Sequence, residues 1–207
     1  MQEMIKRKVK RMLKGRDPAH DFHHIMRVYN NAKLIGRREG TNMEILLPAV
    51  LLHDIVVYPK GCAKSAKSSD ESADLAENIL QGYDYPQDQI NQICYCIRAH
   101  SYSKRLMPAS LEGRILQDAD RLDALGAIGI ARTFSIGGSE NRTFYNADDP
   151  FCRSDRDLDD MQWTVDHFQT KLLKLEDAMH TETAKKIAQK RTRFMMLFIR
   201  QLQKEII

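Results

Sequence analysis

Ala49-Val-Leu-Leu-His-Asp-Ile-Val-Val57 places a histidine and an aspartate inside an aliphatic run. A segment this apolar is expected to be buried, and a buried His53-Asp54 pair without partners would lose several kcal/mol of solvation. A cation bound by both side chains would offset that loss. The alternative is a histidine–aspartate pair that satisfies itself by hydrogen bonding and caps a neighbouring helix.

Two other segments carry side chains of the same kinds. His24 follows His20 and Asp21 on one helix face. Asp120 lies in Leu116-Gln-Asp-Ala-Asp-Arg-Leu-Asp-Ala-Leu-Gly126, a stretch with three carboxylates that otherwise has the composition of a buried helix. Imidazole nitrogens and carboxylate oxygens together suit a divalent cation that keeps open positions. The candidate ligands are His24, His53, Asp54 and Asp120.

The rest of the chain has a helical period almost throughout, and no run alternates as a strand would. The pattern predicts an all-α domain that is not a simple four-helix bundle. Small residues at Gly126, Ala127 and Gly129 are expected to let a neighbouring helix approach. Helices are expected over about residues 4–13, 18–39, 41–57, 70–80, 86–100, 116–133, 157–175 and 181–204, with an irregular stretch over 135–156.

Length and composition describe an ordinary globular protein. The 207 residues suit one domain, and 43% hydrophobic with 29% charged residues is typical of soluble proteins. The apolar runs are too short to span a membrane, and the charged N-terminus has no signal-peptide stretch. We therefore expect a cytoplasmic enzyme without a membrane partner. The four cysteines form no CxxC pair, so reduced thiols are favoured over a zinc site or disulfides.

Basic residues gather at both ends of the chain. Residues 1–16 and 185–207 each hold seven Lys or Arg. Such ends can contact nucleic acid. The sequence favours solvated faces of two amphipathic terminal helices instead, because neither end interleaves aromatics for base stacking. The apolar side of the last helix suits either the core or a homodimer surface.

Two other segments match known motifs only in part. Asp155-Arg-Asp-Leu-Asp159 begins like a calcium-binding EF-hand loop, but its sixth position is Asp160 where such loops have glycine. Gly126-Ala-Ile-Gly129 matches neither a Walker loop nor a dinucleotide-binding fingerprint, since no strand precedes it.

The order of the candidate ligands along the chain resembles that of the HD superfamily of metal-dependent phosphohydrolases. The pattern is His24, then His53-Asp54, then Asp120 within Ala-Asp-Arg-Leu. Within that superfamily the chain is similar to small stand-alone bacterial members, including nucleotide pyrophosphohydrolases. The likeness extends over about residues 17–205. Asp70 stands about where these relatives tend to have an arginine, so substrate contacts from that segment are not carried over.

The resemblance implies an HD-domain helical bundle with additional C-terminal helices and no significant sheet. We expect one domain over residues 1–207, with a metal-site core at about 17–133 and a helical extension at about 134–207. His24, His53, Asp54 and Asp120 would be the metal ligands, with Asp118 as the alternative to Asp120. One divalent cation is expected, Mn²⁺ first, with Mg²⁺, Ni²⁺, Fe²⁺ and Zn²⁺ as alternatives.

The implied reaction is hydrolysis of a (deoxy)nucleoside triphosphate to monophosphate and pyrophosphate. A nucleoside 5′-monophosphatase, or another small-phosphoester hydrolase, is the alternative in the same class. A non-catalytic metal- and nucleotide-binding regulatory module is the alternative from another class. Asp54, Asp21 or Asp123 would orient the attacking water, while His100 would protonate the leaving oxygen or bind phosphate, or else be a surface histidine. The candidate phosphate-binding residues are Lys60, Arg27 and Lys104.

Overall fold

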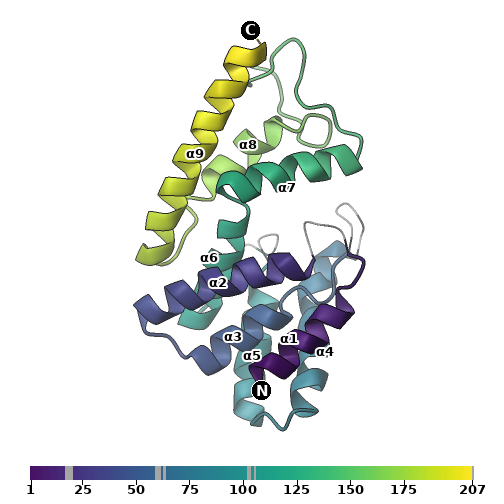
Figure 1. Cartoon of the computed structure of the whole chain (residues 1–207), viewed down its shortest axis with the longest axis vertical. Coiled ribbons are helices and arrows are strands. Elements are labelled where there is room, and N and C mark those ends of the chain that lie inside the picture. Colours follow the sequence, from purple (N-terminus) through teal and green to yellow (C-terminus); the bar gives the residue numbers. More distant parts are fainter. Residues whose placement is uncertain (17–20, 59–61, 63, 102–103, 105, 207) are drawn as a thin grey trace. The chain divides into compact units, whose positions relative to one another are not determined.

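The computed structural model describes residues 1–16, 21–58, 62, 64–101, 104 and 106–206 (Figure 1). The candidate Lys60, and His20 on the predicted helix face of His24, lie outside them. The chain divides into two compact units, Met1–Asp120 and Arg121–Ile207.

The predicted all-α class is confirmed. The described residues form nine α-helices and no β-strand, and one isolated bridge pairs Thr143 with Trp163. No helix within the described ranges is both long enough and apolar enough to cross a bilayer. The α-helices and the two short 3-10 turns are α1 (Gln2–Met12), α2 (Phe22–Glu39), α3 (Met43–Leu52), η1 (Ser65–Lys67), α4 (Ser68–Gln81), α5 (Gln87–Ala99), α6 (Leu111–Asp123), α7 (Gly126–Ser139), α8 (Asp166–Thr170), η3 (Leu172–Lys174) and α9 (Glu182–Ile206).

Helix α3 is the centre of the first unit. Every residue from Ile45 to Leu52 is buried, which explains why this helix is apolar on all sides. It packs against α1, α2 and α5, and α5 in turn packs along α4. The Asn42 side chain caps α3 by accepting a hydrogen bond from the Glu44 amide. The core of the unit is thus a single apolar helix surrounded by amphipathic ones.

The predicted helix over 41–57 ends earlier than expected, at Leu52. His53 is its C-cap residue, and its Nδ1 lies 2.7 Å from the carbonyl oxygen of Val50, which belongs to the last turn. The side chain therefore takes up a carbonyl that a longer helix would have bound through its backbone. This early end leaves His53 and Asp54 at a helix terminus.

The second unit contains α7, α9 and the shorter α8. Helices α7 and α9 pack together, and Phe134, Phe168 and Phe198 form an aromatic cluster with ring centroids 5.9–6.3 Å apart. Along α9, Met195 is buried while Phe194 and Leu197 are exposed. The apolar side of this helix thus supplies core residues and surface residues, and a homodimer stays a prediction.

The predicted helix over 116–133 is wrong as a single element. It is divided into α6 and α7 at Gly126, whose φ of +71° lies in the left-handed region that favours glycine. The expectation of close approach holds at this glycine, because a Cβ there would lie 3.1 Å from Cγ of Arg191 on α9. The same residue therefore breaks one helix and admits another.

The predicted helix over 157–175 is also wrong. Only α8 and η3 form there, and turns fill the remainder. The Asp159 carboxylate accepts hydrogen bonds from the Met161 and Gln162 amides, at 2.9 and 3.2 Å. Such local side-chain bonds compete with helical ones. The same bonds occupy a carboxylate that an EF-hand would need.

Candidate metal centre

Two buried histidines stand at the ends of two helices in the same way. His53 is the C-cap of α3 and His100 is the C-cap of α5. In each, Nδ1 lies 2.7 Å from the carbonyl oxygen three residues earlier, that of Val50 or Ile97. A carbonyl accepts, so Nδ1 carries the hydrogen and Nε2 presents a lone pair when the ring is neutral. Each ring therefore presents either a lone pair or a titratable proton at Nε2, toward the neighbouring carboxylate.

The carboxylate of Asp54 lies among three imidazoles. Its Oδ2 is 3.7 Å from Nε2 of both His24 and His53, and its Oδ1 is 3.3 Å from Nε2 of His100. The side chains of the three histidines are 0–7% exposed, whereas that of Asp54 is 18% exposed. The cluster is thus buried on its histidine side and open to solvent on its carboxylate side.

Asp120 of α6 adds a second carboxylate. Its Oδ1 lies 3.6 Å from Nε2 of His24 and 3.9 Å from Nε2 of His53. The side chain of Asn31 in α2 donates to the carbonyl of Ala119 at 3.3 Å, which ties α2 to α6 beside this carboxylate. Asp118 is buried and belongs to neither metal-type cluster found among the described residues.

Those clusters are two overlapping triads, His24–His53–Asp120 and His53–Asp54–His100. Within each triad the ligand atoms lie within 4.8 Å of one another, a separation that one cation can bridge. Nε2 of His53 is buried without a hydrogen-bond partner among the described residues. A buried polar atom of this kind requires a partner. The donor set of nitrogen and oxygen fits a first-row divalent cation.

The pKa shifts follow from burial and from these neighbours. Burial lowers the pKa of His53. Burial acts in the same direction on His100, but the Asp54 carboxylate outweighs it, so the pKa of His100 is raised. Burial opposes ionisation of Asp54, yet His53 and hydrogen bonds from His100 and His24 hold its pKa well below the usual value. Asp54 is therefore an anion at neutral pH.

The family of the chain follows from comparison with known proteins. The HD domain model matches residues 21–125, a span that includes both triads. The chain belongs to the HD domain family. It is 33% identical to the Bacillus subtilis protein YpgQ, over 99% of this chain and 93% of that protein.

Solved structures agree with this assignment. The crystal structure of Bacillus subtilis YpgQ in complex with ADP is 34% identical, with a TM-score of 0.76 over 99% of this chain and 94% of that one. A structure from Bacillus thuringiensis, described as an HD-superfamily hydrolase, is 35% identical, with a TM-score of 0.77 over 99% and 95%. The expected HD-superfamily resemblance is thus confirmed, and it supports a metal-dependent hydrolase.

The segment that follows the HD pair is held from two sides. The hydroxyl of Ser72 in α4 accepts from the Val56 amide and donates to the Val56 carbonyl, at 3.0 and 3.1 Å. The guanidinium of Arg16 donates to the carbonyls of Ile55 and Val57, each at 3.3 Å. These bonds fix the backbone next to Asp54. Neither Ser72 nor Arg16 stands out in the sequence, because their role depends on backbone carbonyls.

Of the other predicted residues in the HD domain, Asp21 caps α2 by accepting a hydrogen bond from the His24 amide at 2.9 Å. Asp123 lies in the second unit, where its carboxylate pairs with Arg132 at 2.8 Å. Asp21 therefore has a direct structural link to a candidate ligand. The carboxylate of Asp123 is occupied by a guanidinium.

Two of the three predicted phosphate-binding side chains, those of Lys104 and Arg27, lie within the described residues. Lys104 donates to Asp70 at 2.6 Å and to the Arg98 carbonyl at 3.1 Å. Arg27 is half-buried in α2, one turn after His24. Lys60 lies outside the described residues. The carboxylate of Asp70 is therefore paired with a nearby lysine.

Proposed function

We propose that this protein is a metal-dependent phosphohydrolase that cleaves (deoxy)nucleoside triphosphates to monophosphate and pyrophosphate. The observation that carries the proposal is the meeting of three buried imidazoles and two carboxylates, with one imidazole nitrogen left without a hydrogen-bond partner among the described residues. Hydrolases of phosphate esters and anhydrides need charge neutralisation on phosphoryl oxygens, which such a cation site supplies.

His24, His53, Asp54 and Asp120 would hold the cation. Mn²⁺ is our first expectation, with Mg²⁺, Ni²⁺, Fe²⁺ and Zn²⁺ as alternatives, since two imidazoles and two carboxylates suit any of them. When bound, the cation would supply an acidified water and polarise a phosphoryl oxygen. The two carboxylates are the more exposed members of the cluster, so substrate would approach from their side.

His100 would hold a proton for the reaction. The Asp54 carboxylate, 3.3 Å from its Nε2, favours the protonated ring and raises its pKa. A proton held at Nε2 can be donated to the leaving oxygen or hydrogen-bonded to a phosphate. The side chain is only 7% exposed, which argues against the alternative of a surface histidine. Asp21 would act as a positioning residue through the His24 amide.

The nucleotide substrate rests on the likeness to YpgQ, whose crystal structure holds ADP. The 34% identity over nearly the whole chain supports a similar ligand for this protein. Arg27, Lys60 and Lys104 remain the candidate phosphate contacts. To bind a phosphate, Lys104 would have to leave the Asp70 carboxylate and pair with a phosphate oxygen instead. Both partners are anionic.

The test is hydrolysis by metal-stripped protein with each cation added back singly. Pyrophosphate and orthophosphate are measured separately over a panel of nucleoside mono-, di- and triphosphates. Asp54→Ala is the active-site variant, and Asp74→Ala is the control because it removes an exposed carboxylate of α4 that pairs with Arg98. Metal-dependent pyrophosphate release, lost in Asp54→Ala and kept in Asp74→Ala, supports the proposal.

Other products would identify the alternatives. Orthophosphate from monophosphates would favour the nucleotidase. Stoichiometric metal binding without turnover on any nucleotide would reject the hydrolase and favour a regulatory module.

A further inference from the structure

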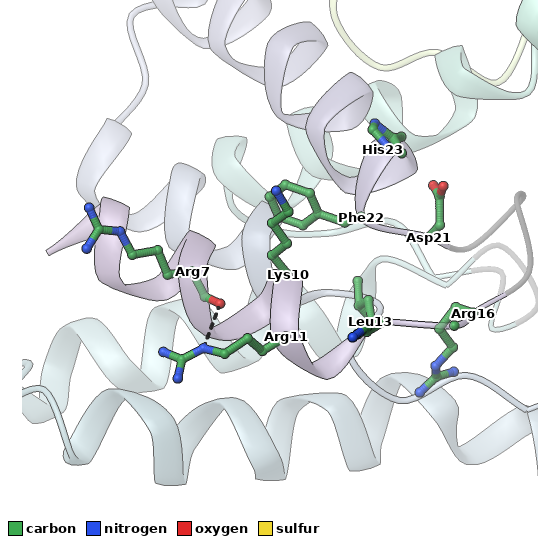
Figure 2. A pocket seen from close by; sticks show the side chains of 10 residues that line it. Arg7, Lys10, Arg11, Leu13, Arg16, Asp21, Phe22 and His23 are labelled. Carbon is green, nitrogen blue, oxygen red and sulfur yellow. Dashed lines mark hydrogen bonds between the residues drawn. The ribbon is translucent and has the colours of Figure 1, made fainter.

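A groove of about 640 Å³ lies beside α1 and the first turn of α2 (Figure 2). None of its described lining residues is a candidate metal ligand. Its lining contains five cationic side chains, those of Arg7, Lys10, Arg11, Lys14 and Arg16. The groove is therefore separate from the candidate metal centre, and the metal centre does not explain its positive charge.

The described lining of this groove has five cationic side chains and one carboxylate. Arg7, Lys10 and Arg11 are exposed and share one face of α1 by their spacing. Among the described residues, no carboxylate lies within 4.0 Å of the charged groups of Arg7, Lys10, Arg11 or Lys14. Like charges this close in sequence repel one another on a helix. A bound anion would relieve that repulsion.

The groove also contains an aromatic surface. Nζ of Lys10 lies 5.9 Å from the ring centroid of Phe22, and Figure 2 shows its side chain reaching that ring. Asp21 is the one carboxylate in the described lining, and its Oδ1 accepts from the His24 amide. A planar base can stack on an aromatic ring while phosphates meet the surrounding cations.

We propose that this groove binds a nucleoside phosphate, as a second site apart from the metal centre. Its volume lies within the range of about 300–1,000 Å³ that is usual for small-molecule sites. A single-stranded nucleic acid would need an extended basic track with several stacking aromatics. The described lining has only the phenyl ring of Phe22 and the imidazole of His23, which is fewer than such a track needs. A free nucleotide is therefore favoured over a nucleic acid.

The groove is joined to the metal centre by hydrogen bonds. Arg16 lines it and also holds the carbonyl of Ile55, directly after Asp54. Asp21 lines it and holds the amide of His24. Substitution of either residue would disturb both places, so the test variants leave them unchanged. Through these hydrogen bonds, a nucleotide bound in the groove can shift the backbone beside the candidate metal ligands His24 and Asp54.

The test measures binding of ADP and of inorganic tripolyphosphate by calorimetry, with EDTA present so that hydrolysis and metal binding do not contribute. The groove variant is Arg7→Gln/Lys10→Gln/Arg11→Gln. The matched control is Lys186→Gln/Lys190→Gln/Arg193→Gln, which removes three exposed cations from α9. We expect wild type and the α9 variant to bind ADP alike, and the groove variant to bind about 10-fold more weakly or not at all, since charge-assisted hydrogen bonds are lost.

Phe22→Leu tests the nucleoside part of the proposal. We expect weaker binding of ADP and unchanged binding of tripolyphosphate. Equal losses in both charge variants, no ADP binding by wild type, or an unchanged ADP affinity in Phe22→Leu would each overturn the proposal. Groove-dependent binding of a single-stranded oligonucleotide without binding of ADP would also overturn it and favour a nucleic-acid partner. Because no metal is present, these results are independent of whether the protein hydrolyses nucleotides.

Discussion

Each unit of the molecule holds an aspartate among polar partners, but the two units surround it in opposite ways. In the first unit, Asp54 faces imidazole nitrogens at 3.3–3.7 Å. In the second unit, the fully buried Asp166 receives two bonds from the guanidinium of Arg156, at 2.6 and 2.7 Å, and one from the Asp159 amide at 2.9 Å. The Asp166 carboxylate is neutralised by a guanidinium, whereas the Asp54 carboxylate has only imidazoles as partners.

The comparison separates a site from a structural network. A bidentate guanidinium satisfies a carboxylate completely and leaves nothing for a ligand to do. An imidazole whose Nδ1 is held by a carbonyl, such as His53 or His100, offers only a lone pair or one titratable proton at Nε2. A cluster of such rings around carboxylates is balanced by a cation. Acidic residues alone therefore do not locate the metal centre, whereas the partners of those residues do.

The largest expected effect comes from removing the charge of Asp54. Asp54→Asn keeps the shape of the side chain, and we expect loss of bound metal and a fall in turnover of more than ~100-fold, because even outer partners of metal ligands are worth 10–100-fold. Elemental analysis of the purified protein gives the metal content per chain, and a steady-state assay gives turnover. Retention of stoichiometric metal in this variant would remove Asp54 from the ligand set.

In the second unit, removing the guanidinium of Arg156 is expected to lower the stability of the fold. Arg156→Met leaves Asp166 charged and buried, which should lower the free energy of unfolding by about 3–5 kcal/mol. Urea titration measures this change. The double variant Arg156→Met/Asp166→Leu removes both charges and should recover most of the loss. A change below about 1 kcal/mol in the single variant, as for a surface pair, would contradict the buried-network interpretation.

A smaller effect is expected at Gln117, a positioning residue of the first unit. Its side-chain amide is 1% exposed and donates to the carbonyls of Ala99 and Leu106, at 2.7 and 2.9 Å. Gln117→Met keeps the volume but removes both bonds next to His100. We expect kcat to fall about 10-fold with bound metal unchanged, as for other supporting residues.

The control for this variant is Gln92→Met, which removes an exposed side-chain amide from α5 that donates to the Asp88 carbonyl. Kinetics and metal content are compared for both variants. Equal falls in kcat and metal content for Gln117→Met would indicate general loosening of the unit. An unchanged kcat would show that His100 does not depend on the two hydrogen bonds of Gln117.

The sequence predicted which side chains lie near one another in the HD domain better than it predicted the helix ends. His24, His53, Asp54 and Asp120 were proposed from a buried context and a family resemblance, and the structure brings them together. Their meeting is predictable because apolar periodicity places each segment in the core. The burial of His100 was not predictable, since it depends on long-range contacts such as that between Gln117 and the Ala99 carbonyl.

The wrong predictions share a physical cause. Gly126 was expected to permit packing inside a helix, but its positive φ also ends one. Asp159 was expected in a helix and instead binds the amides of its own turn. Periodicity detects which side of a segment is apolar, whereas a left-handed glycine or a side chain bound to backbone decides whether the helix continues. The apolar pattern of the sequence contains no information on either feature.

The smallest effect, at Asp149 of the second unit, depends on pH. The amides of Arg153 and Ser154, together with the Ser154 hydroxyl, hold the pKa of Asp149 at about 2, below the usual 3.8. A carboxyl whose pKa is lowered by folding stabilises the folded state above its unfolded pKa and loses that contribution as the pH falls through its folded pKa.

Asp149→Asn should therefore be less stable than wild type at pH 7, and the difference should shrink between about pH 4 and pH 2. Urea midpoints of both proteins across this window measure it, with Asp148→Asn as the control at the neighbouring exposed carboxylate. A difference that stays constant down to pH 2 would mean that Asp149 acts through shape and not through charge. That outcome would weaken the contrast between the units, because it rests on carboxylates neutralised by the fold in one and left for a cation in the other.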